Sequence, residues 1–234
     1  MNIKYFSRTE IAIWSVSVVL IVLSYLLFKS GEILTLAASL IGVTSLILNA
    51  KGNPLGQVLV IIFSLLYGII SFTFAYYGEM ITYLCMTAPM AVIALISWLR
   101  HPYNGNRSEV EICCVKRRDY PIIILLTIAV TVAFYFILAA LDTANLLPST
   151  ISVTTSFLAV LLTYKRSPAF ALAYAANDIV LIVLWSIASF SDTSYISVVV
   201  CFLCFLINDI YGYINWRCIQ RRQQSGGNAA KVAA

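Results

Sequence analysis

Apolar positions dominate the chain in eight long segments, and the charged positions lie almost entirely between them. Each segment contains 18 to 23 residues, and a helix of that length, rising 1.5 Å per residue, spans a hydrocarbon core of roughly 30 Å. Helices that are apolar all round are typical of membranes, so the pattern predicts eight transmembrane helices. The expected spans are Ile11–Phe28, Ile33–Ala50, Leu55–Tyr77, Met80–Leu99, Pro121–Leu141, Leu146–Tyr164, Pro168–Phe190 and Tyr195–Trp216.

The composition is that of a membrane protein rather than of a soluble or disordered one. Hydrophobic residues make up 61% of the 234 residues and charged residues 11%, whereas soluble domains contain about 45–50% and about 25%. Disordered chains and ordinary soluble enzymes are therefore excluded. The first span is longer than a signal-peptide core and no small-residue cleavage site follows it, so we expect a retained helix. The whole chain, 1–234, is expected to form one all-α transmembrane domain.

The basic residues predict which side of the membrane each connection faces. If eight spans alternate, the connections on the side of the termini hold fourteen of the 15 Lys and Arg residues, and the opposite side holds only Lys29. Lys and Arg gather in cytoplasmic loops, so both termini are expected in the cytoplasm. This topology explains the net charge of +5, and without a basic patch interleaved with aromatic residues we expect no nucleic-acid partner.

The six cysteines and the single histidine, His101, indicate no cofactor and no metal site. Cys201 and Cys204 lie one turn apart inside a span, where two small soft side chains indicate packing rather than redox or metal chemistry. One histidine cannot supply a histidine-based zinc site or a catalytic triad.

Two blocks of three spans resemble each other in the same orientation. Ile41-Gly-Val-Thr-Ser45 is similar to Ile151-Ser-Val-Thr-Thr155, and each block continues with a basic turn and a proline, Pro54 or Pro168. Coincidence of hydropathy is the alternative. A true repeat predicts an extra N-terminal helix followed by a 3+1+3 bundle, with the substrate between the halves near the midplane. The parts are then the extra helix 11–28, the first repeat 33–99, the linker helix 121–141, the second repeat 146–216 and the cytoplasmic tail 217–234.

Asp178 and Asp209 are the only residues of the Asp, Glu, Lys, Arg or His type within the eight spans. A charge at the bilayer centre costs at least ~2.5–3.5 kcal/mol, so an intramembrane acid indicates a functional site. Each acid follows an asparagine, Asn177 or Asn208. The alternative is that these two pairs only bridge helices through hydrogen bonds.

Further polar and aromatic residues share helical faces with the acids. Trp185 lies two turns from Asp178, whereas Trp98 and Trp216 end their spans where a tryptophan belt is expected. Carboxylates, aromatic faces and amides together suit a small, flat, polar cation. A proton or sodium ion at Asp178 is the other use of such an acid. The candidate substrate-binding residues are Asn177, Asp178, Trp185, Asn208, Asp209, Tyr211, Asn215, Ser64, Tyr67, Tyr83 and Thr87.

Four stretches of the chain form a recognisable set: Tyr77-Gly-Glu-Met80, Ala88-Pro-Met90, Asn177-Asp178 with Trp185, and Asn208-Asp-Ile-Tyr-Gly-Tyr-Ile-Asn-Trp216. The set resembles the PnuC family of bacterial vitamin transporters over roughly residues 31 to 217. The resemblance implies a SWEET-like fold in the bacterial inner membrane and no enzymatic activity. It also implies uptake of nicotinamide riboside by facilitated diffusion, with a cytoplasmic kinase that phosphorylates the substrate and traps it.

Two departures from the family leave the substrate open. Ile182 stands where nicotinamide riboside carriers usually have a tryptophan, and Ala91 stands where they commonly have a glutamine. Relatives carry thiamine, riboflavin or deoxynucleosides, so thiamine or another nucleoside is the alternative, as is proton-coupled symport. An intramembrane aspartyl enzyme is disfavoured because neither acid lies in a Gly-x-Gly-Asp loop. The expected partners are the small-molecule substrate, the lipid bilayer, the kinase and, in a homo-oligomer, further copies of the chain.

Overall fold

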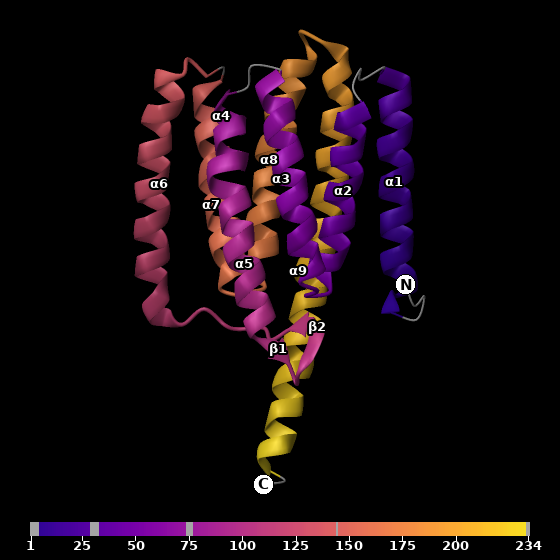
Figure 1. Ribbon diagram of the computed structural model, residues 1–234, viewed down its shortest axis with the longest axis vertical. Helices are drawn as coiled ribbons and strands as arrows, with labels where there is room; N and C mark the ends of the chain where they lie inside the picture. Colours follow the sequence, from indigo (N-terminus) through magenta and orange to yellow (C-terminus); the bar gives the residue numbers. More distant parts are fainter. Residues whose placement is uncertain (1–4, 29–32, 74–76, 144, 233–234) are drawn as a thin grey trace.

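Eight membrane-length helices run side by side through the molecule (Figure 1). The structure, a computed structural model, describes residues 5–28, 33–73, 77–143 and 145–232. Within these ranges all eight predicted spans are helices long and apolar enough to cross a membrane. The helices are α1 (Arg8–Phe28), α2 (Ile33–Ala50), α3 (Leu55–Thr73), the continuous span α4 (Tyr77–Ile81), η2 (Thr82–Thr87) and α5 (Ala88–Arg100), then α6 (Tyr120–Ala140), α7 (Leu146–Tyr164), α8 (Ala169–Ser189) and α9 (Ile196–Val232).

Two boundaries differ from the sequence-based expectation. The third span ends at Thr73 rather than Tyr77, which instead begins α4, and residues 74–76 lie outside the described ranges. The last helix continues well past Trp216 to Val232, so the expected tail extends α9 beyond the bundle (Figure 1). Lys4, Lys29 and Glu32 also lie outside the described residues.

Six of the spans form a closed ring. In order around the ring they are α2, α3, α5, α7, α8 and α9, and α9 packs back against α2. Small residues allow close approach, as is usual between membrane helices. A Cβ on Gly42 would collide with the Phe205 ring and lie 3.1 Å from the Phe63 ring, so only glycine lets α2 pass this close to both rings.

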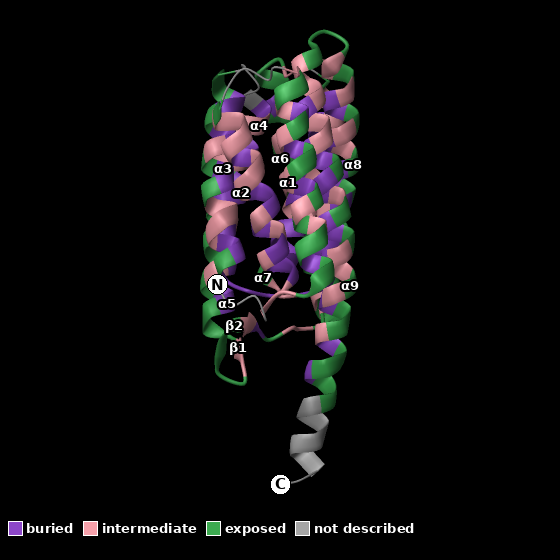
Figure 2. Ribbon diagram, turned by 90° about the vertical axis from the view of Figure 1, so that its right-hand side faces the viewer, coloured by how far each residue is buried: buried purple, intermediate pink, exposed green. Residues whose placement is uncertain are grey.

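The two remaining helices, α1 and α6, lie outside the ring at opposite edges of the bundle (Figure 1). The α1 helix packs on α2 and α9, and α6 packs on α7. Leu138 of α6 is fully buried against Met86 of η2 and Val153 of α7. Exposed residues lie along the outward faces of the bundle (Figure 2), and many of them are large and apolar, as a lipid environment requires.

A β-hairpin, absent from the sequence-based expectation, lies beneath the ring. Strands β1 (Pro102–Tyr103) and β2 (Asn106–Val110) pair through a turn at Asn104 and Gly105, both with positive φ. Asn-Gly is the preferred dipeptide of this two-residue hairpin turn. The fully buried Val110 donates its amide to the Gly52 carbonyl at 2.9 Å. The hairpin therefore docks on the turn between α2 and α3.

The two halves of the ring meet through matching contacts at the same end. The Trp98 indole of α5 donates to the Thr163 carbonyl of α7 at 3.0 Å, and the Trp216 indole of α9 donates to the Asn49 carbonyl of α2 at 2.7 Å. Both tryptophans are fully buried, so the expectation of interfacial belt residues is wrong. A parallel repeat would produce such reciprocal contacts, and they support the repeat, which stays a prediction.

Candidate substrate-binding cavity

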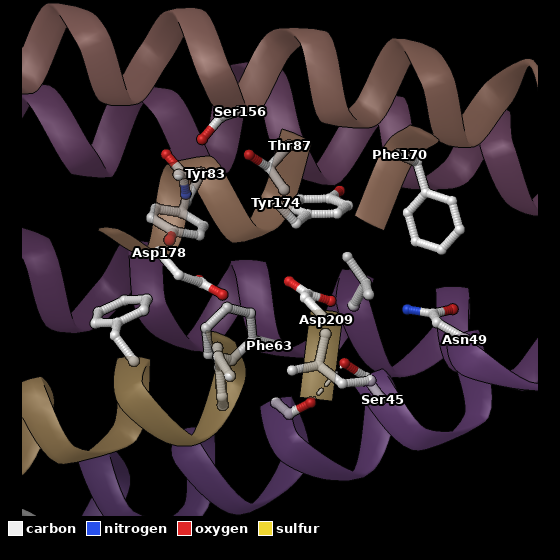
Figure 3. A pocket seen from close by; sticks show the side chains of 16 residues that line it. Ser45, Asn49, Phe63, Tyr83, Thr87, Ser156, Phe170, Tyr174, Asp178 and Asp209 are labelled. Carbon is white, nitrogen blue, oxygen red and sulfur yellow. Dashed lines mark hydrogen bonds between the residues drawn. The ribbon is translucent and has the colours of Figure 1, made fainter. Parts of the chain in front are cut away.

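A cavity of about 60 Å³ lies inside the ring, and all six ring spans contribute to its wall (Figure 3). Five of the expected residues, Tyr83, Thr87, Asn177, Asp178 and Asp209, line it. The other lining residues are Gly42, Ser45, Leu46 and Asn49 of α2, Val60 and Phe63 of α3, Ser156 of α7, Phe170 and Tyr174 of α8, and Phe202 and Phe205 of α9.

The two acids come from neighbouring helices and face the same space (Figure 3). Asp178 lies at the centre of α8 and Asp209 lies on α9, and both residues are about 95% buried. Their carboxyl groups interact with each other. One Asp178 oxygen accepts no hydrogen bond from any described residue. The arrangement concentrates acidic oxygens in a buried space, where a bound cation would be attracted strongly.

The opposite part of the wall is shaped by a π-helical turn. Pro89 has no backbone N–H to donate to the Cys85 carbonyl, and the turn before it widens so that Ala88 N–H donates to the Tyr83 carbonyl, five residues back. Such π-turns are frequent at functional sites. The widened turn places the side chains of Tyr83 and Thr87 at the cavity.

Aromatic rings occupy most of the space around the acids. Phe63 of α3 packs edge-to-face against Tyr83 and Phe205, with ring centroids 5.9 and 5.8 Å apart. Ligand sites usually measure about 300–1,000 Å³, so a nucleoside-sized molecule would require these rings to move. The described conformation is closed around the acids.

Asn177 has a structural role as well as a place in the cavity wall. Its side-chain oxygen accepts hydrogen bonds from Ser152 and Thr155 of α7, at 3.0 and 2.9 Å. It therefore joins α8 to α7 beside Asp178.

Three expected residues lie toward the other end of the ring from the tryptophan contacts, outside the cavity wall. Trp185 is buried against the Tyr195 ring at 5.3 Å rather than beside the acids. Tyr67 packs on Tyr83 with ring centroids 4.6 Å apart, and Ser64 is fully buried. Two helical turns separate Trp185 from Asp178, which carries the ring beyond the cavity.

The remaining three expected residues bond to neighbouring helices instead of lining the cavity. Asn208 donates to Ser17 of α1 at 3.0 Å, Tyr211 donates to Glu10 of α1 at 3.1 Å, and Asn215 donates to the Ala50 carbonyl at 2.8 Å. They share a stripe of α9 next to the one that carries Asp209. The helix-bridging alternative describes the observed contacts of Asn208.

The α2 helix contributes cavity residues that are not among those expected from the sequence. Gly42, Ser45 and Asn49 follow each other at spacings of three and four residues, which places them on one face of the helix. This small and polar stripe within an apolar span was the available signal. Among the described residues, no group of three or more His, Cys, Asp or Glu residues is placed to hold a metal ion.

Comparison with known proteins adds a family and a fold. The family model described as nicotinamide mononucleotide transporter matches residues 32–218. The nicotinamide riboside transporter PnuC of Neisseria mucosa is 26% identical over 216 residues, which cover 90% of this chain and 82% of that protein. The crystal structure of the vitamin B3 transporter PnuC matches with a TM-score of 0.81 and 22% identity, covering 93% of this chain and 94% of the other.

Proposed function

The chain belongs to the nicotinamide mononucleotide transporter family and is a multi-pass membrane transporter, and from this we propose that it carries nicotinamide riboside. The relative in Neisseria mucosa is named for that substrate. Nicotinamide riboside has a flat pyridinium ring with a positive charge and a ribose with several hydroxyls. Its chemistry therefore matches a cavity that combines acids, aromatic rings and hydroxyl groups.

The observation that carries the proposal is the charge of the cavity. Asp178 and Asp209 are its ionisable acids, and none of its described lining residues is Lys, Arg or His. A pyridinium ring would balance an acid there. The phosphate of nicotinamide mononucleotide would be repelled by the acids and would find no basic partner. The cavity therefore favours the riboside over the mononucleotide.

The same charge argument supports trapping by phosphorylation. We infer that the carrier works by facilitated diffusion. The sequence contains no Gly-x-x-x-x-Gly-Lys-Ser/Thr motif, which binds the phosphates of a nucleotide, so the chain has no such site through which ATP could drive transport. A cytoplasmic kinase that adds a phosphate would convert the substrate into a product that the acidic cavity rejects. Return through the carrier would then be blocked.

The proposed orientation places both termini in the cytoplasm and the protein in the bacterial inner membrane. The N-terminal residues and the α9 extension lie at one end of the bundle (Figure 1), the end that carries fourteen of the 15 basic residues in the predicted topology. Cysteines introduced at Ser225 and at Asp192 should react with an impermeant reagent from opposite sides. Reaction of both from the same side would overturn the topology.

The function is tested with proteoliposomes that contain the purified protein but no ATP and no ion gradient. Labelled nicotinamide riboside should equilibrate across the membrane, and nicotinamide mononucleotide should not. Thiamine, another flat ring cation that the two acids could balance, serves as the competing substrate. Uptake that requires an imposed proton or sodium gradient would replace facilitated diffusion with symport.

A further inference from the structure

A second cavity, of about 310 Å³, lies at the end of the bundle away from the termini. Its wall is formed by the start of α4, the loop between α6 and α7 with the first turn of α7, and the end of α8 with the turn that follows it. The residues that matter for its chemistry are Glu79, Thr143, Ser191, Asp192 and Tyr195. It is distinct from the central cavity, because the two share no lining residue.

Glu79 gives this outer cavity a buried carboxyl group. Both of its carboxylate oxygens are buried, and no hydrogen bond of normal geometry from a described residue reaches them, although the Tyr67 hydroxyl lies near the carboxyl group. The Thr143 hydroxyl on the same wall is likewise buried without a described partner. Buried polar groups are normally paired. Two unpaired groups on one cavity therefore indicate a ligand that pairs with both.

A second acid lies at the rim of the outer cavity. Asp192 is exposed, and the backbone N–H of Ser194, at 2.8 Å, holds the pKa of its carboxyl below the ordinary value. None of the described residues that line the cavity is Lys, Arg or His. A lining with two acidic side chains and no basic one favours cations over anions from solution.

A polar and aromatic path leads from this cavity to the central one. Glu79, Tyr83 and Thr87 follow each other one turn apart along the fourth span. Tyr83 lines the central cavity, packs on Tyr67 at 4.6 Å and lies within electrostatic reach of both Glu79 and Asp178. The two tyrosine rings thus lie between the acid of the outer cavity and the acid of the central one.

We propose that the outer cavity is a separate binding site for an organic monocation, which it holds against Glu79 before the cation passes the Tyr67–Tyr83 pair. The inference deepens the proposed function, on which the identity of the travelling substrate rests. An aromatic cation fits better than a metal ion, because the described residues offer two acids at most and one apolar wall that includes Leu184 and Ile187.

The test uses a cysteine placed in the outer cavity, so that its readout does not depend on transport. Ser191→Cys, in an exposed turn on the cavity wall, is labelled from outside with an impermeant maleimide in an Asp178→Asn background, in which central binding is expected to be strongly weakened. Nicotinamide riboside and the smaller cation 1-methylnicotinamide should slow labelling, and neutral nicotinamide should not. Adding Glu79→Gln should raise the cation concentration needed for half protection by about tenfold or more, since a desolvated opposite charge contributes at least that much.

Asp142→Asn is the matched control, because Asp142 is an exposed acid at the same end of the bundle that does not line the cavity. It should leave protection unchanged. Equal protection by neutral nicotinamide, or unchanged protection in the Glu79→Gln protein, would overturn the proposal. The comparison between the cations and neutral nicotinamide uses a protein that retains Glu79, so it stays informative if the Glu79→Gln protein does not fold. Protection without riboside uptake by the wild-type protein would contradict only the proposed function, whereas uptake without protection would contradict only the outer site.

Discussion

The two three-span halves of the ring are alike where they meet and different where they face the cavity. At the end of the bundle that holds the termini, each half offers a buried tryptophan, Trp98 or Trp216, to a backbone carbonyl of the other. The neighbouring side chains repeat the arrangement, since Ser97 donates to the Tyr164 carbonyl and Asn215 to the Ala50 carbonyl. The contacts that hold the ring closed are therefore shared equally.

The acids belong to one half only. Counted from the reciprocal contacts, Asp178 lies 15 residues after Thr163, and the position 15 residues after Asn49 is Ser64. Asp209 lies seven residues before Trp216, and the position seven residues before Trp98 is Ala91. The first half supplies Phe63, Tyr83 and Thr87 to the cavity instead.

The difference separates residues that build the ring from residues that select the substrate. A contact present in both halves is explained by closing the ring, and no ligand is needed to account for it. A buried acid present in one half carries a desolvation cost that closing the ring does not explain. We therefore assign substrate selection to the asymmetric positions, and the predictions below test that division.

The largest effect is expected for Asp178→Asn, because it removes the charge from the asymmetric position. Nicotinamide riboside affinity should fall by about 100-fold, in line with the loss of one desolvated charge partner. The melting temperature should not fall, since the variant relieves the burial of a charge. The measurement is ligand titration beside thermal unfolding of the purified protein in detergent.

Ser64→Ala at the matching position of the first half is the control for that prediction. It should change affinity by less than about threefold, because it removes no charge. A large loss of affinity in the Ser64→Ala protein, or wild-type affinity in the Asp178→Asn protein, would contradict the assignment of substrate selection to the asymmetric positions.

Trp98→Phe and Trp216→Phe should destabilise the protein to similar extents. Each leaves one buried carbonyl without its donor, which costs about 1–3 kcal/mol of unfolding free energy. Neither should change riboside affinity by more than about threefold, since the indoles do not line the cavity. Thermal unfolding of both variants checks this, and a strong loss of stability in one variant alone would argue against equivalent contacts.

The smallest effect is expected for Tyr211→Phe, which removes the hydroxyl that donates to Glu10. Stability should fall by about 1–2 kcal/mol, because the bond is made to a charged acceptor. Riboside affinity should stay at the wild-type value. Weakened riboside binding with unchanged stability would instead indicate that Tyr211 contacts the substrate.

The partners of Tyr211 show a second contrast, between the two helices outside the ring. Glu10 of α1 accepts hydrogen bonds from Tyr211 and from Lys51, the latter at 3.1 Å, and its carboxylate also accepts the Ser7 amide. Among the described residues, α6 makes one side-chain hydrogen bond to the rest of the protein, between the hydroxyls of Thr131 and Thr154 at 2.8 Å. The α1 helix is thus attached through a partly buried ion pair and α6 mainly through packing.

Much of the fold follows from the sequence, because a membrane leaves few options. Apolar length alone predicts the eight spans, since lipid requires every backbone group to be paired within a helix. The boundary at Thr73 and the π-turn before Pro89 were not predicted, because both depend on local hydrogen bonding rather than on hydropathy. The hairpin had a signal in Asn104-Gly105 that the basic character of the loop obscured.

The candidate site was predicted in part. Asp178 and Asp209 were found because a charge in lipid is conspicuous, and Tyr83 and Thr87 followed from their span. Asn208, Tyr211 and Trp185 were assigned to the same site because they are polar or aromatic and lie near an acid in sequence. Sequence spacing predicts which face of a helix a residue lies on but not which helix packs against that face. The α1 partners of Asn208 and Tyr211 could therefore not be predicted.

The most direct measurement is a structure of the protein with nicotinamide riboside bound. If the acids of the second half select the cation, the pyridinium nitrogen should lie within about 4–6 Å of the Asp178 or Asp209 carboxylate, the range over which an opposite charge acts strongly. The rings of Phe63 and Phe205 should have moved to admit it. A pyridinium ring seated against Ser64 and Ala91 in the first half, or beside Trp185 and away from both acids, would contradict this assignment.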